Sequence, residues 1–78
     1  MKEIATRRFK DVLTHHFGFA QVPGGKTGRD TWTDRKGRRI HPVTRHKSVP
    51  IAALYCTGME MEAQGVCSRT DFMRKFKN

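Results

Sequence analysis

The residues best suited to chemistry lie between positions 26 and 50, a stretch rich in arginine, lysine and histidine. Attack of a ribose 2′-hydroxyl on its own phosphate needs a proton acceptor and a positive group near the phosphorus. His41 could accept the proton, and Arg29 and Arg39 could stabilise the phosphate charge. Alternatively, His41 is a half-exposed strand residue before Pro42 with no catalytic role.

Basic side chains in the same stretch could instead hold phosphates without any chemistry. Such contacts bind nucleic acid regardless of sequence and make affinity depend strongly on salt. A merely solvated surface is the alternative, and a net charge of +9 over 78 residues argues against it. The candidate nucleic-acid-binding residues are Lys26, Arg29, Arg35, Lys36, Arg38, Arg39, Arg45 and Lys47.

A β-hairpin is expected to position these groups. The sequence DRKG at residues 34–37 is typical of a type I turn closed by a left-handed glycine. A loop of this length pairs Asp34 with Arg38 and Trp32 with Ile40, so that the two large apolar side chains share one face. A tighter register would split this apolar pair, so we favour the first. The other face would carry Arg29, Thr31, Thr33, Arg39 and His41.

Helices and one further strand are expected around the hairpin. Residues 2–16 have the spacing of an amphipathic helix, residues 19–22 read as a strand, and residues 68–76 begin with a capping-box-like motif. Pro50 suits the first position of a helix that ends at Gly65. In that helix the apolar residues at helical spacing are Ile51, Leu54, Tyr55 and Met59.

These elements predict an α+β fold in a single domain, residues 1–78. We expect a three-stranded antiparallel sheet with helices on one face, a short C-terminal helix and an open basic face. A chain of this length can build only one thin core.

Charge and composition narrow the possible partners. Sixteen Lys and Arg against seven Asp and Glu favour a polyanion, with nucleic acid first and an anionic membrane surface second. No apolar run approaches the length of a membrane span, and no signal-peptide pattern is present, so we expect a cytoplasmic protein.

Metal ions and other cofactors are not expected. Cys56 and Cys67 are interpreted as reduced thiols, one of them buried on a helix. Together with His41 and His46 they form no CxxC or HxxxH pair, which a structural zinc site would need.

Short motifs in sequence order resemble those of the HicA toxin family. They are Phe17–Phe19 (the family's "GF"), Gly37–Ile40 ("GRRV"), His46–Pro50 ("H…P"), Pro50–Leu54 ("PxGTL") and Gly65–Phe72 ("G[IL]SxEEF"). The resemblance implies an α-β-β-β-α fold like a double-stranded-RNA-binding domain. It also implies RNA as ligand, a metal-independent endoribonuclease activity and a HicB-like antitoxin that covers the active face.

Two features depart from the family. The segment 50–65 is about one helical turn longer than the family's helix. The family's catalytic histidine, in a "GSHH" motif, is absent, because residues 27–30 read Thr-Gly-Arg-Asp and either Arg29 or Asp30 takes its place.

The sequence therefore leaves three functions open: an RNA-cleaving toxin that uses His41, a non-catalytic nucleic-acid-binding module, and an interaction domain whose basic face docks an acidic protein.

Overall fold

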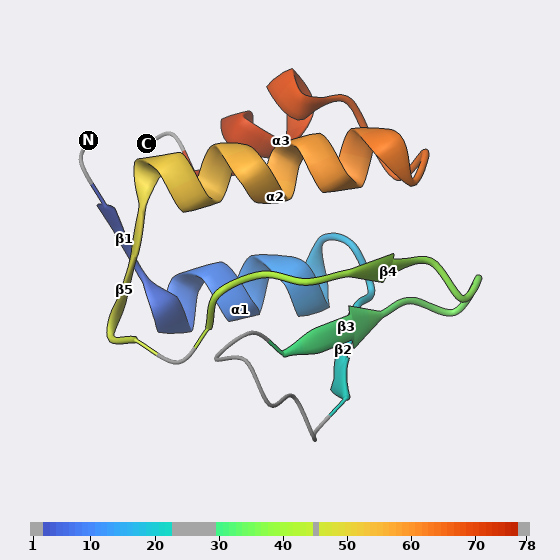
Figure 1. Ribbon diagram of the computed structural model, residues 1–78, viewed down its shortest axis with the longest axis horizontal. Helices are drawn as coiled ribbons and strands as arrows, with labels where there is room; N and C mark the ends of the chain where they lie inside the picture. The colour runs from blue at the N-terminus through green and yellow to red at the C-terminus, as the bar shows by residue number, and fades with distance from the viewer. Residues whose placement is uncertain (1–2, 23–29, 45, 77–78) are drawn as a thin grey trace.

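The computed structural model describes residues 3–22, 30–44 and 46–76 and shows a small α+β protein (Figure 1). Strands β2, β3 and β4 form a three-stranded antiparallel sheet, and β1 pairs with β5 in a second, two-stranded sheet. The elements in chain order are β1 (Glu3–Ala5), α1 (Thr6–His15), β2 (Ala20–Val22), β3 (Thr31–Thr33), β4 (Arg39–Ile40), β5 (Ser48–Pro50), α2 (Ile51–Ala63) and α3 (Arg69–Arg74).

The hairpin between β3 and β4 has the register expected from the sequence. Trp32 pairs with Ile40, and both side chains are buried. The Asp34 N–H donates to the Arg38 carbonyl over 3.1 Å, and Gly37 has φ of 80°, the left-handed conformation that the turn requires. The apolar pair and the turn chemistry thus agree on one register.

The prediction of a helix from residue 2 is wrong for residues 3–5, which form β1. Ile4 pairs with Val49 of β5, and both side chains are buried. The partner lies more than forty residues away, so local periodicity does not indicate this strand. The helix α1 begins only at Thr6, and it buries Phe9 and Leu13 on one face, as an amphipathic helix does.

The face of α2 that packs into the core also differs from the prediction. The residues buried on this helix are Leu54, Thr57, Gly58 and Met61, whereas Tyr55 and Met59 are exposed. Gly58 explains the difference, because α3 lies directly against it. A Cβ at this position would be 3.1 Å from Arg69 Cγ and 3.3 Å from a ring carbon of Phe72.

The start of α2 differs in detail as well. Pro50 is the last residue of β5 rather than the first of the helix, and no side chain caps the helix. The Ser48 hydroxyl, close to the start of the helix, donates to the Glu3 carboxylate over 3.1 Å. The sequence at residues 48–50 therefore serves the β1–β5 pairing.

The short α3 completes the core. The Ser68 hydroxyl accepts a hydrogen bond from the Asp71 N–H over 3.1 Å, as the capping motif predicts. Phe72 and Phe76 are buried, and the Phe76 ring lies 6.0 Å from the ring of Phe9 on α1. The two ends of the chain thus share one hydrophobic cluster.

Candidate nucleic-acid interface

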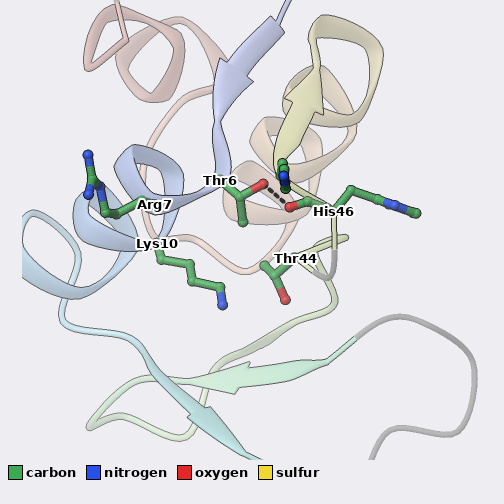
Figure 2. A pocket seen from close by; sticks show the side chains of 6 residues that line it. Thr6, Arg7, Lys10, Thr44 and His46 are labelled. Carbon is green, nitrogen blue, oxygen red and sulfur yellow. Dashed lines mark hydrogen bonds between the residues drawn. The ribbon is translucent and has the colours of Figure 1, made fainter.

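A basic hollow of about 450 Å³ opens between the start of α1 and the segment that leads into β5 (Figure 2). None of the described residues that line it is acidic. They are Thr6, Arg7, Lys10, Thr44, His46 and Lys47, and we call this set the basic hollow.

Thr6 holds the two walls of the basic hollow together. Its backbone N–H donates to the Lys47 carbonyl over 2.9 Å, and its buried hydroxyl donates to the His46 carbonyl. These bonds continue the β1–β5 pairing by one residue. They fix residues 46 and 47 beside the first two turns of α1, which supply Arg7 and Lys10.

The charge at the start of α1 opposes the helix dipole. The helix has neither a side-chain cap nor an acidic residue in its first turn, and Arg7 occupies that turn instead. Anions are stabilised at a helix N-terminus and cations are not. Arg7, Lys10 and Lys47 therefore add positive charge where the backbone is already positive, and a bound anion would relieve this repulsion.

Figure 2 shows how the cations are arranged. The Lys10 side chain extends from α1 toward Thr44, into the space between the two walls, whereas Arg7 points away along the helix and lies at the rim. Lys10 is the cation placed best to meet a group inside the hollow.

Asp30 fixes the wall that carries Thr44. This buried carboxylate accepts hydrogen bonds from the Thr44 hydroxyl over 2.9 Å and from the Gln21 amide over 2.6 Å. Asp30 therefore has a structural role in linking β2 to the segment before β5. Arg29, the other candidate for the position of the family's histidine, lies outside the described residues.

The predicted binding residues do not form a single cluster. Lys47 lines the basic hollow, and Arg39 is exposed on β4. Arg35 and Lys36 are exposed on the hairpin turn, which Figure 1 shows at the opposite end of the molecule from β5. Lys26, Arg29 and Arg45 lie outside the described residues.

Arg38 is half-buried, and its side chain binds two other parts of the protein rather than extending into solvent. Its Nε lies 2.6 Å from an Asp34 carboxylate oxygen, and its Nη1 donates to the Gly65 carbonyl over 3.0 Å. The Asp34 side chain also accepts N–H bonds from Lys36 and from Arg38. Burial alone would raise the Asp34 pKa, but these hydrogen bonds and the Arg38 charge outweigh burial and hold it below its ordinary value.

His41 lies against α2, on the side of the hairpin that faces the helix. Its backbone N–H donates to the Glu60 carboxylate over 3.1 Å, and its Nδ1 lies 3.3 Å from the same group. We expected His41 on the open face beside Arg39. The position differs because strand pairing ends at Ile40 and the buried Pro42 redirects the chain.

The contact with the Glu60 carboxylate orients the His41 ring, and the sequence did not indicate this contact. A carboxylate that holds Nδ1 favours the tautomer protonated there and leaves Nε2 to accept a proton. The His41 side chain is 53% exposed, so a ligand can reach it. The two residues are nineteen positions apart, and no local pattern links them.

The cysteines are free thiols, and neither is buried on a helix, contrary to expectation. Cys56 is exposed on α2, while Cys67 is half-buried before α3, where burial raises its pKa. Within residues 3–22, 30–44 and 46–76, no three His, Cys, Asp or Glu side chains are grouped closely enough to hold a metal ion.

No protein family matches the chain, and no curated protein or solved structure is detectably similar to it. None of the described helices has the length and apolar character needed to cross a membrane.

Proposed function

We propose that this protein binds RNA, and that phosphate groups of the RNA occupy the basic hollow. The single observation that carries the proposal is the hollow itself. Lys10 and Lys47 line the hollow at the uncapped start of α1, Arg7 lies at its rim, and no acidic side chain among the described residues lines the site. Phosphate is the anion that both helix N-termini and lysine clusters commonly bind.

The resemblance to HicA toxins extends this proposal. The order α1, β2, β3, β4, α2 is the order expected for a double-stranded-RNA-binding-domain-like fold, with β1 added before α1, its partner β5 added before α2, and α3 at the end. On this basis we infer a HicA-like protein of a toxin–antitoxin system, placed in the cytoplasm with its RNA. A HicB-like antitoxin with an acidic surface would then compete with RNA for the basic hollow.

Cleavage of RNA is a second candidate function, and the contact between His41 and Glu60 favours it. The Glu60 carboxylate would orient the imidazole so that Nε2 takes the proton from the 2′-hydroxyl. The 2′-oxygen would bond to phosphorus, and the leaving 5′-oxygen would take a proton from solvent. The step written in this way needs no metal ion, in keeping with the resemblance to HicA toxins.

One experiment distinguishes the candidates. Purified protein is titrated into fluorescently labelled single-stranded and duplex RNA in EDTA, and both anisotropy and strand integrity are recorded. Salt-sensitive binding of intact RNA supports the non-catalytic module, and cleavage that His41→Ala abolishes supports the enzyme. Absence of binding at low salt would remove the RNA proposal. The net charge of +9 would then be explained by docking to an acidic protein or to vesicles of anionic lipid.

A further inference from the structure

A second hollow, of about 390 Å³, lies next to the basic hollow on α1. The described residues that line it are Ala5, Arg7, Arg8 and Asp11, and we call this set the second hollow. Arg7 therefore lines both hollows. Figure 2 shows Arg7 extending along the helix, away from Lys10 and out of the basic hollow. The two hollows meet at this side chain.

Helical geometry arranges the lining side chains in a fixed order around α1. At about 100° per residue, Lys10 and Asp11 lie on opposite sides of Arg7, three and four positions further along the helix. Side chains at these spacings are neighbours, with Cβ atoms about 5–6 Å apart. A ligand that meets Lys10 in the basic hollow can thus reach Arg7 and then Asp11 without leaving the surface of α1.

Asp11 gives the second hollow a chemistry that the basic hollow lacks. One carboxylate oxygen lies 3.2 Å from His15 Nε2, one turn further along α1, and the other has no partner among the described residues. The Asp11 side chain is 67% exposed, so a ligand can reach it. A carboxylate repels a phosphate but accepts a hydrogen bond from a hydroxyl group. Arg7 beside Asp11 therefore suits a sugar bonded to a phosphate better than a second phosphate.

We propose that the second hollow receives the ribose next to the phosphate in the basic hollow, and that Asp11 accepts a hydrogen bond from its 2′-hydroxyl. Phosphate contacts hold RNA and DNA alike, whereas the 2′-hydroxyl lets a protein tell RNA from DNA. Asp11 is then the residue that makes the site prefer RNA. This inference rests on the proposed function, because it requires phosphates to enter the basic hollow.

The test is fluorescence anisotropy with three labelled single strands of one sequence at one salt concentration. They are RNA, DNA with deoxyuridine in place of thymidine, and RNA with fluorine in place of each 2′-hydroxyl. The 2′-fluoro strand keeps the sugar shape of RNA but has no hydroxyl to donate. The wild type should bind RNA about three- to tenfold more tightly than the other two strands, the range expected for one hydrogen bond. Strand integrity is recorded in the same samples.

Asp11→Ala removes the acceptor and should bring the three affinities together. This variant also loses a negative charge, so its affinity for every strand should rise. The ratio of RNA to DNA affinity is therefore the quantity to compare. Asp71→Ala is the matched control, because it removes the same charge from an exposed position on α3 and should keep the ratio of the wild type. Circular dichroism confirms that both variants are folded.

Three results would overturn the inference and leave phosphate binding in the basic hollow intact. The first is equal affinity of the wild type for RNA and DNA. The second is a preference for RNA that Asp11→Ala retains, because another group would then discriminate. The third is equal affinity for RNA and its 2′-fluoro form, because sugar shape would then be responsible. Absence of binding to all three strands would instead overturn the proposed function, and this inference with it.

Discussion

Replacing Lys10 and Lys47 by alanine together tests whether phosphates enter the basic hollow. The two side chains come from opposite walls of the hollow, and the third cation, Arg7, lies at the rim. Each neutralised phosphate of a single strand contributes about 0.7 to the slope of log affinity against log salt. Loss of two contacts should therefore reduce the slope by about 1.4. Between about 50 mM and about 200 mM salt, the variant should lose about sevenfold less affinity than the wild type.

The assay is anisotropy of a labelled single-stranded RNA, titrated at four or more salt concentrations. Arg74→Ala with Lys75→Ala is the matched control, because it removes the same charge from exposed positions at the end of α3. A slope reduced equally by both pairs would show that net charge alone governs binding. The basic hollow would then have no special role.

If the protein cleaves RNA without metal, His41→Ala should slow the reaction by about 10² to 10⁴, and Glu60→Gln should slow it less, as followed with end-labelled RNA. Equal cleavage by all three proteins would remove His41 from the mechanism. The lowered pKa of Asp34 stabilises the fold fully above its ordinary value of 3.8, and this stability is lost as the pH falls through the folded-state pKa. Asp34→Asn should therefore destabilise the protein most at neutral pH and least in acid, as measured by urea unfolding across pH; a constant difference would contradict this account. Gly58→Val should lower the unfolding free energy by about 1–3 kcal/mol, since its side chain meets Phe72, and a neutral effect in the same assay would show that α3 moves freely.

Local signals in the sequence were sufficient for the hairpin. The turn at residues 34–37 and the alternation around Trp32 and Ile40 act within ten residues, and both favour the same register. The cap formed by Ser68 is equally local. Such elements can be predicted because their stabilising contacts are close in sequence.

Contacts distant in sequence explain the wrong assignments. Residues 3–5 form a strand only because Val49 pairs with Ile4, and α2 buries Gly58 because Phe72 of α3 packs there. A glycine inside a helical pattern can mark the close approach of a second helix. Gly58 was therefore the one sequence signal of the contact between α2 and α3.

The candidate site was also predicted only in part, because some of its residues meet through contacts that are distant in sequence. Lys47 is among the binding residues predicted from the basic run, but Arg7 and Lys10 are not. The hydrogen bonds of Thr6 to residues 46 and 47 bring these groups together across forty residues. Basic residues at a helix start, where the dipole disfavours them, were the one sequence signal that could have found the basic hollow.

Mapping the RNA contact by NMR tests the central claim most directly. A single-stranded RNA is titrated into ¹⁵N-labelled protein, and the amide shifts of residues 6–10 and 46–47 are followed with those of α3. We predict saturable shifts around the basic hollow that disappear at high salt, with residues 69–74 unaffected. Saturable shifts confined to α3 or to the hairpin turn, with the basic hollow unchanged, would contradict the proposed binding site.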